Sequence, residues 1–368
     1  MQQQKSRRRT GRRLSSGLWA SAVLLPLAGG AAALIGNYFV NFALARKDYA
    51  MELAPADATS TVDLEAMDAG RVSYARLRER VLSDRGLRRE TVCIRSEDGL
   101  RLEADLYQPG TDRDKGKASG GNHRYVIFVH GYQSGRSTAL SRNFISVYLS
   151  RGFQVLAPDN RAHGGSEGQY IGMGWLDRRD LLCWIRFLIR RDPKAEICVH
   201  GVSMGGAAVM MLSGEALPKQ VKALVEDCGY TSVWAEFRSE LSYLYRLPAF
   251  PVLYLADAAA GLRAGYRFQE ASSLRQLRKA NRPMLFIHGG ADRFVPYEML
   301  RQNFAACKSA AKKMLTVEGA GHAEAYLREP ERYWQTVFSF LKDAGLDSAG
   351  PDKTDSDKTG LDGQKRSS

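Results

Sequence analysis

The sequence lacks the patterns that hold metal ions and phosphates: it has no HExxH, no cluster of histidines and carboxylates at ligand spacing, and no P-loop. It also lacks a CxxC pair, and its cysteines are scattered, at Cys93, Cys183, Cys198, Cys228 and Cys307. An odd and scattered set of cysteines predicts neither a disulfide framework nor a zinc site. We therefore expect no metal, no cofactor and no disulfide scaffold.

Charge is missing from Leu14 to Ala45, a run long enough to cross ~30 Å of hydrocarbon with ~20 helical residues. The positive side chains that crowd the residues before it are typical of a membrane-topology signal, so we expect no nucleic-acid partner. The pattern predicts a basic cytoplasmic segment over 1–16, a single-pass transmembrane anchor over 17–45, and the remaining chain outside the cell membrane. A cleavable signal peptide is the alternative, because Ala43-Leu44-Ala45 has the form of a cleavage site.

The rest of the chain alternates short apolar runs with longer helical patterns and contains no internal repeat. Residues 46–90 predict a helical connector that packs through Tyr74, Leu77 and Val81, and residues 91–109 predict a β-hairpin. Strands are expected over 125–131, 153–159, 197–201, 221–229, 283–289 and 313–319, and helices over 138–150, 175–191, 204–215, 296–309 and 331–344. This alternation predicts an α/β fold with a mostly parallel, doubly wound sheet covered on both faces.

Two segments stand apart from the alternation. Residues 230–280 are too long for one connection and have no clear strand, so we expect a mostly helical cap insertion, with a simple extra pair of helices as the alternative. Residues 346–368 are poor in apolar side chains and predict a disordered tail. The main domain is therefore expected over 91–345.

The segment "ICVHGVSMGGAA" runs from an apolar strand through a serine between glycines into a row of small residues. Gly-x-Ser-x-Gly between a strand and a helix is typical of a nucleophile elbow, where a strained serine lies at the carboxyl end of a parallel strand. A glycine-rich turn that only packs a helix closely is the alternative. We predict that Ser203 is a nucleophile.

A serine hydroxyl needs a base to take its proton, and in enzymes with this elbow the acid and then the histidine follow the serine along the chain. Only His322 follows both Ser203 and the best acid candidate, Asp292, which lies directly after the strand "PMLFIHG". Asp227 and Glu318 are rival acids. We predict Ser203, His322 and Asp292 as nucleophile, base and acid.

Backbone amides are expected to stabilise the oxyanion that such a serine creates. The candidates are Met204, which follows the serine, and Tyr132 in "VIFVHGYQSG", with Gln133 a weaker choice. A polar, glycine-rich loop over 158–175 and the neighbouring His130 are expected to brace the elbow rather than react. Its bracing side chains are predicted to be Asp159, Arg161, His163 and Ser166.

Five motifs in this order, "HGYQSG", "DNRAHGGSEG", "GVSMGG", "GADRFVP" and "GAGHAEAY", resemble the α/β-hydrolase superfamily over about residues 91–345. The chain looks most like bacterial single-span, membrane-anchored hydrolases of the serine-aminopeptidase-like branch. This resemblance implies the α/β-hydrolase fold and places the family's nucleophile, acid and base on Ser203, Asp292 and His322. The sequence departs from the family at Asn160 and Ala162, in a loop that often carries glycine before its histidine.

We therefore expect a serine hydrolase that cleaves a carboxylic ester, or a related acyl bond, through an acyl-enzyme. Its substrate would be a small-molecule ester, a lipid or a peptide. A serine peptidase acting on short peptides is the alternative, and Glu236, Glu240 or Asp257 could then bind a substrate ammonium group. An alternative of another class is an inactive, membrane-tethered binding module.

Overall fold

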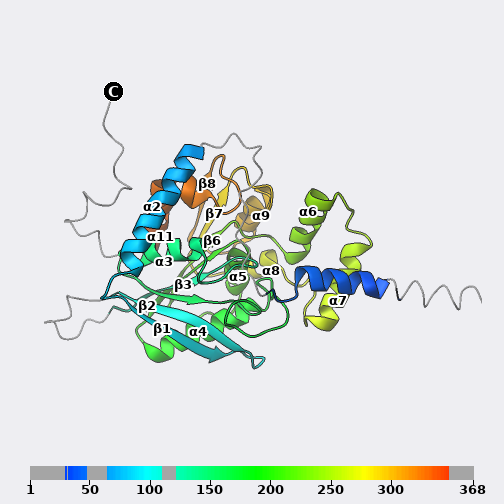
Figure 1. Ribbon diagram of the computed structural model, residues 1–368, viewed down its shortest axis with the longest axis horizontal. Helices are drawn as coiled ribbons and strands as arrows, with labels where there is room; N and C mark the ends of the chain where they lie inside the picture. The colour runs from blue at the N-terminus through cyan, green and yellow to red at the C-terminus, as the bar shows by residue number, and fades with distance from the viewer. Residues whose placement is uncertain (1–29, 31, 48–63, 110–121, 348–368) are drawn as a thin grey trace, which may run out of the picture.

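The computed structural model describes residues 30, 32–47, 64–109 and 122–347, and its centre is one eight-stranded sheet (Figure 1). The strand order is β1-β2-β4-β3-β5-β6-β7-β8. The strands are β1 (Arg88–Arg95), β2 (Arg101–Gln108), β3 (Arg124–Val129), β4 (Gln154–Pro158), β5 (Glu196–Val202), β6 (Val221–Asp227), β7 (Met284–Gly289) and β8 (Lys312–Val317). β1 and β2 form the expected antiparallel hairpin, β2 runs antiparallel to β4, and β3 to β8 are parallel.

Helices cover both faces of this sheet. The helices are α2 (Leu64–Leu82), α3 (Ala139–Ser150), α4 (Asp177–Arg191), α5 (Met204–Leu212), α6 (Val233–Tyr245), α7 (Val252–Arg263), α8 (Ser273–Leu277), α9 (Glu298–Ala306), α10 (Ala325–Arg328) and α11 (Pro330–Asp343). Buried residues of α2, α3 and α11 pack on one face of the sheet, and those of α4, α5, α8 and α9 pack on the other. The predicted doubly wound α/β fold is confirmed, and only the short α10 was not expected.

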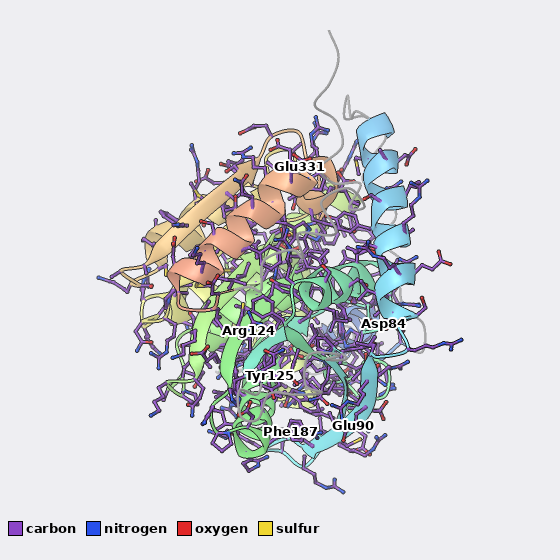
Figure 2. All side chains as sticks on the ribbon, turned by 90° about the vertical axis from the view of Figure 1, so that its left-hand side faces the viewer. Asp84, Glu90, Arg124, Tyr125, Phe187 and Glu331 are labelled. Atoms are coloured by element: carbon purple, nitrogen blue, oxygen red, sulfur yellow. The ribbon has the colours of Figure 1, made fainter. Side chains whose placement is uncertain are left out.

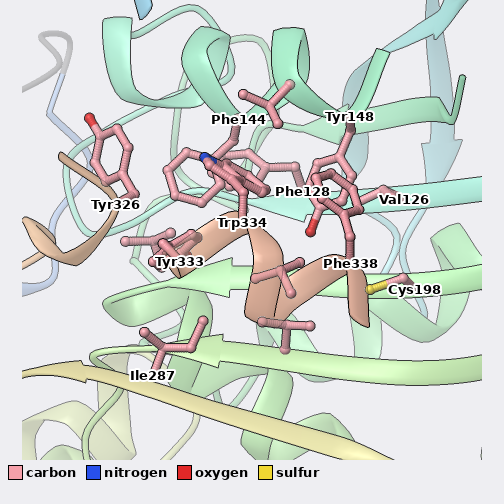
Figure 3. Packing of buried hydrophobic residues seen from close by; sticks show 14 of the residues in the cluster. Val126, Phe128, Phe144, Tyr148, Cys198, Ile287, Tyr326, Tyr333, Trp334 and Phe338 are labelled. Carbon is pink, nitrogen blue, oxygen red and sulfur yellow. The ribbon is translucent and has the colours of Figure 1, made fainter. Parts of the chain in front are cut away.

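The two cores follow from the period of two along each strand. In β3, Val126 and Phe128 enter the core under α3 and α11, whereas Tyr125 and Ile127 enter the opposite core. Figure 3 shows the first core, where Phe144 and Trp334 meet with ring centroids 5.3 Å apart. Both faces of the central strands are apolar because helices bury both.

The connector and the tail meet this first core. α2 is the expected connector helix, and its Tyr74 is buried, donates a hydrogen bond to the Tyr326 carbonyl oxygen and accepts one from Trp334 Nε1. At the other end Leu346 is fully buried, so the expected boundary of the tail at residue 346 is wrong by at least that residue. Residues 48–63 and 348–368 lie outside the described residues.

The expected cap interval contains α6, α7 and α8, so it is mostly helical as predicted. α6 and α7 lie on the right-hand side of the molecule in Figure 1, away from the β1–β2 hairpin. Ser232 pairs with Ser272 in an isolated bridge that closes the base of the insertion.

The described part of the predicted membrane anchor lies on the domain. Residues 32–43 form a helix beside α7 (Figure 1), and Val40 and Leu44 are fully buried in a cluster with Met204 of α5 and Leu253 of α7. Ala45 then pairs with Tyr170 in an isolated β-bridge. Within the described residues no helix is long and apolar enough to span a bilayer. The predicted single transmembrane helix over 17–45 therefore finds no support there, because its second half packs against protein; residues 17–29 and 31 lie outside the described residues.

Candidate active site

Ser203 lies in the sharp turn between β5 and α5. Its backbone has φ 58° and ψ −119°, a left-handed conformation that is strained for a residue with a side chain. A Cβ at Gly201 would lie 2.1 Å from the Gly205 carbonyl oxygen, and one at Gly205 would lie 2.1 Å from the Val129 carbonyl oxygen. Both positions need glycine, which is the reason for the Gly-x-Ser-x-Gly pattern.

Three distant loops bring the predicted catalytic side chains together. His322 Nε2 lies 2.9 Å from Ser203 Oγ, and His322 Nδ1 lies 2.8 Å from Asp292 Oδ2. The other oxygen, Asp292 Oδ1, accepts hydrogen bonds from the backbone amides of Phe294 and Val295 at 2.9 and 3.0 Å. The carboxylate is thus held on both sides, and a continuous chain of hydrogen bonds leads from it to the serine hydroxyl.

The charges of Asp292 and His322 stabilise one another. Burial alone would lower the pKa of His322, but the Asp292 carboxylate, together with the charges of Asp227 and Glu240, makes the net shift of the pKa upward. Burial would raise the pKa of Asp292, but His322 and His288 hold that pKa well below its usual range. The pair therefore favours an ionised Asp292 and a His322 that is a stronger base than an isolated buried imidazole.

The sequence did not indicate that a second histidine contacts the same carboxylate. His288, at the end of β7, places Nε2 3.2 Å from Asp292 Oδ2 and 2.9 Å from the Val295 carbonyl oxygen. The only signal was its position at a strand end, four residues before Asp292. His288 helps to position the carboxylate.

Neither rival acid bonds to His322. The Asp227 carboxyl, at the end of β6, accepts a hydrogen bond from the Tyr333 hydroxyl at 2.8 Å and makes no hydrogen bond to a histidine ring in the described part of the chain. Glu318 makes no hydrogen bond or ion pair with another side chain among the described residues. The geometry favours Asp292 over both.

The loop after β3 approaches the serine closely. A Cβ at Gly131 would lie 3.4 Å from Ser203 Cβ, so the backbone beside Tyr132 passes directly next to the hydroxyl. The amide of Gln133 already donates to His163 Nε2 at 3.1 Å, which removes Gln133 from the candidate oxyanion donors. Met204 begins α5, where backbone amides and the helix dipole favour negative charge. A small pocket at Ser203 is lined by Gly131, Tyr132, Ser134, Leu140, Val202 and Phe294.

Two histidines brace this loop. His130 Nε2 accepts from the Asn160 amide and its Nδ1 lies 2.8 Å from the Gly131 carbonyl oxygen; burial lowers its pKa to about 4. His163 Nδ1 lies 2.9 Å from the Arg161 carbonyl oxygen, and burial lowers its pKa to about 3. Both rings are therefore neutral and bonded to backbone on both nitrogens. Neither contacts Ser203.

The remaining loop residues form an ion-pair network below the site. Asp159 pairs with Arg136 at 2.6 Å and accepts from the Gly165 amide, while Arg161 pairs with Asp180 at 2.7 Å. Arg136 was not predicted, although its place in the loop after β3 was visible in the sequence.

Ser166 and Ala162 belong to the same loop, in which the sequence departs from the pattern of the family. Ser166 Oγ donates to the Asp159 carbonyl oxygen at 2.6 Å. Ala162, where related loops often carry glycine, has a positive φ of 61°. The loop keeps this conformation despite the cost of a side chain there.

One group of potential metal ligands occurs among the described residues. The ligand atoms of Cys228, Asp292 and His322 lie within 4.8 Å of one another. The hydrogen bond between Asp292 and His322 accounts for the closeness of these two, and the same imidazole bonds to Ser203. The arrangement suits proton transfer within the chain of three side chains.

Fold and site together define the α/β-hydrolase class. The model of the "Alpha/beta hydrolase family" matches residues 126–336, and the chain belongs to this family. The resemblance of the five motifs to the α/β-hydrolase superfamily is thereby confirmed.

Relatives agree with this assignment. The chain is 29% identical over 217 residues to the uncharacterized protein YqkD of Bacillus subtilis, a match that covers 59% of this chain and 70% of YqkD. It is 24% identical over 192 residues to the lysophosphatidylserine lipase ABHD12 of Mus musculus, which covers 50% of this chain and 46% of ABHD12. This chain thus spans about half the length of that lipase.

Solved structures share the fold. The esterase Pf2001 of Pyrococcus furiosus superimposes with a TM-score of 0.56 at 24% identity, covering 70% of this chain and 93% of the esterase. A puromycin-hydrolyzing peptidase of Mycobacterium tuberculosis superimposes with a TM-score of 0.53 at 20% identity, covering 72% of this chain and 40% of the peptidase. Esterases and peptidases both use this fold, and the chain is a hydrolase.

Proposed function

We propose that this protein is a serine hydrolase that cleaves a carboxylic ester through an acyl-enzyme. The observation that carries the proposal is the unbroken hydrogen-bond chain from Asp292 through His322 to Ser203, with the serine strained at the tip of an elbow. A serine hydroxyl becomes a competent nucleophile when such a base is in hydrogen-bond reach.

In the proposed reaction, Ser203 Oγ attacks the carbonyl carbon of the ester while His322 Nε2 takes the hydroxyl proton. The negative charge that forms on the carbonyl oxygen is stabilised by the amides of Tyr132 and Met204. His322 gives its proton to the leaving alkoxide, and the alcohol departs from the acyl-enzyme. Water, deprotonated by His322, then attacks the acyl group and releases the acid and the free serine.

Throughout this cycle Asp292 stays ionised and stabilises the imidazolium form of His322. This role is supported by the backbone amides of Phe294 and Val295, which donate hydrogen bonds to Asp292, and by His288 Nε2, which lies 3.2 Å from the same carboxylate. His130, Asp159, Arg161 and His163 would hold the surrounding loops in place and take no proton in the reaction.

An ester with an apolar acyl group is supported by the apolar side chains that line the pocket at Ser203, namely Leu140, Val202 and Phe294. A serine peptidase acting on short peptides is the second candidate, favoured by the carboxylates Glu236 and Glu240 on α6. An inactive binding module is disfavoured, because a module would have no need for the strain at Ser203 or for a buried, aligned histidine and aspartate.

A fluorophosphonate probe tests the enzyme directly. We expect strong labelling of the folded protein, lost in Ser203→Ala and retained in the control Ser150→Ala at the exposed end of α3. A folded wild-type protein that stays unlabelled and hydrolyses no ester would contradict the proposal. A panel of p-nitrophenyl esters against aminoacyl anilides then separates esterase from peptidase.

We also propose that the protein works at the cell membrane, with residues 1–16 in the cytoplasm and the catalytic domain outside. The uncharged run after the basic residues supports this, as do Leu34, Ile35, Tyr38 and Phe42, which are exposed on the helix over 32–43. Protease added to intact cells is expected to cleave the domain. A domain that stays protected until the cells are lysed would refute this orientation.

A further inference from the structure

Two glutamates lie one above the other on one side of α6. Glu236 and Glu240 are four residues apart, so their side chains project from the same face of the helix. The charge of Glu240 is among those that raise the pKa of His322, and the charge of Asp292 is among those that raise the pKa of Glu236. Both glutamates therefore lie within electrostatic reach of the catalytic pair.

The opposite side of the same helix is different. Trp234, Arg238 and Ser242 line an outer groove of about 460 Å³ together with residues of the α6–α7 loop and α7. Arg238 is exposed there and pairs with neither glutamate. The acidic side and the outer side of α6 are thus separate surfaces.

One carboxyl oxygen of Glu236 is buried without a partner. The residue is 2% exposed, and its Oε2 has no hydrogen-bond partner among the described residues. In the described part of the chain, neither Glu236 nor Glu240 forms a salt bridge. Burial raises the pKa of both; the charge of Glu240 raises the pKa of Glu236 further, whereas His322 lowers the pKa of Glu240. A buried carboxyl without a partner is costly and contributes nothing to the fold.

The third acidic residue of this region shows what a structural carboxylate looks like here. Asp257 on α7 is also buried, but it accepts a hydrogen bond from the Phe268 amide at 2.6 Å and pairs with Arg267 at 2.8 Å. Its bonds are satisfied within the protein. Of the three candidates, only the pair on α6 has bonding capacity left for a ligand.

We propose that Glu236 and Glu240 form a cation-binding subsite beside Ser203, and that the substrate carries an ammonium group near its scissile acyl bond. This inference rests on the proposed function and names the substrate class. An ammonium group would supply the missing positive charge, and a primary ammonium would also donate hydrogen bonds to Glu236 Oε2, whereas the quaternary ammonium of choline has no N–H and would interact through its charge alone. Because a bound cation favours the ionised form of a carboxyl, its binding would release a proton from these two buried carboxyls.

The ammonium group could belong to either product of the reaction. On the acyl side the substrate would be an aminoacyl ester or amide, and on the alcohol side it would be a choline or ethanolamine ester. Both place a cation within a few bonds of the carbonyl carbon. Two matched substrate pairs distinguish them.

The first pair is alanine p-nitroanilide and its N-acetylated form, and the second is acetylcholine and 3,3-dimethylbutyl acetate, its uncharged analogue. The readout is the ratio of kcat/KM for the charged to the uncharged member. We expect a ratio of about tenfold or more in one pair, which identifies the side, and a loss of about tenfold in that ratio in Glu236→Gln and in Glu240→Gln. Glu331→Gln, on the exposed part of α11 in Figure 2, is the charge-matched control and is expected to leave the ratio unchanged.

Binding to Ser203→Ala protein separates this inference from the proposed function. Titration calorimetry with alaninamide and with choline is expected to show binding of one of them, with proton release, that weakens about tenfold when Glu236→Gln or Glu240→Gln is added. Binding that depends on neither glutamate, or no binding of either cation, refutes the subsite whatever the enzyme cleaves. Loss of fluorophosphonate labelling in the wild type would instead refute the hydrolase. Glu240→Gln, at a half-buried position, keeps the test valid if Glu236→Gln does not fold.

Discussion

Asp292 Oδ2 lies 2.8 Å from His322 Nδ1 and holds the imidazole with its other nitrogen 2.9 Å from the Ser203 hydroxyl. This geometry raises the pKa of His322 against the effect of burial. Because the base must be neutral to accept the serine proton, activity should fall on the acid side as the pH drops through this raised pKa.

Asp292→Asn tests this relationship. Without the carboxylate, burial dominates and the pKa of His322 falls, so the acid limb of the kcat/KM profile is expected to move to lower pH. The maximal rate should drop by about 10⁴-fold, because the imidazolium is no longer stabilised. Rates measured from pH 5 to 9 decide the matter, and an acid limb that does not move would contradict the proposed role of Asp292.

Gly201→Ala is expected to destabilise the fold. The new Cβ would lie 2.1 Å from the Gly205 carbonyl oxygen. That oxygen belongs to the backbone and cannot rotate away as the end of a flexible side chain could. We expect a loss of about 1–3 kcal/mol or more in the free energy of unfolding in urea. Gly261→Ala on α7, which meets only the flexible Arg267 side chain at 3.1 Å, is the control and should be close to neutral. Equal stability of the two variants would show that the elbow can relax.

Asp227 predicts a pH dependence of stability. Burial raises its pKa from 3.8 to about 6, so the stabilisation it provides is fully present below pH 3.8 and is lost as the pH rises through about 6. A difference of this size corresponds to about 3 kcal/mol. Asp227→Asn keeps an acceptor for the Tyr333 hydroxyl but cannot ionise. The free energy of unfolding in urea of the wild type, minus that of Asp227→Asn, should therefore fall between pH 4 and 7. A difference that stays constant would mean that Asp227 does not titrate in this range.

Leu44 tests the docking of the N-terminal helix on the domain. Its side chain is fully buried beside α5 and α7, so Leu44→Ala should cost about 2–5 kcal/mol of unfolding free energy. Leu34→Ala, at an exposed position of the same helix, should cost little. If both variants were as stable as the wild type, the contact of this segment with the domain would contribute nothing to folding.

Much of the site could be predicted from the sequence. Parallel strands place their carboxyl ends at one edge of the sheet, so residues directly after β5 and β7 had to lie near one another. The order of serine, acid and histidine then left His322 as the base. The strand and helix ranges followed from apolar runs and their periods, because burial on both faces leaves a strong signal.

Several features depended on the third dimension. His288 and Arg136 contact Asp292 and Asp159 through side-chain directions that no spacing in the sequence reveals. Gln133 is excluded as an oxyanion donor only because its backbone amide donates a hydrogen bond to His163. The sequence predicted that residues 32–45 span a membrane, because apolarity alone does not distinguish burial in lipid from burial against α5 and α7.

The sequence by itself determined the α/β sheet and the meeting of Ser203, Asp292 and His322, since both follow from local patterns and chain order. The tertiary structure decided which acidic residues near the site have hydrogen-bond and ion-pair partners. Glu236, Glu240 and Asp257 look alike in the sequence, but within the described residues only Asp257 forms an ion pair with an arginine. A charge is costly or favourable according to what surrounds it, and those surroundings come from chain segments that meet only when the protein folds.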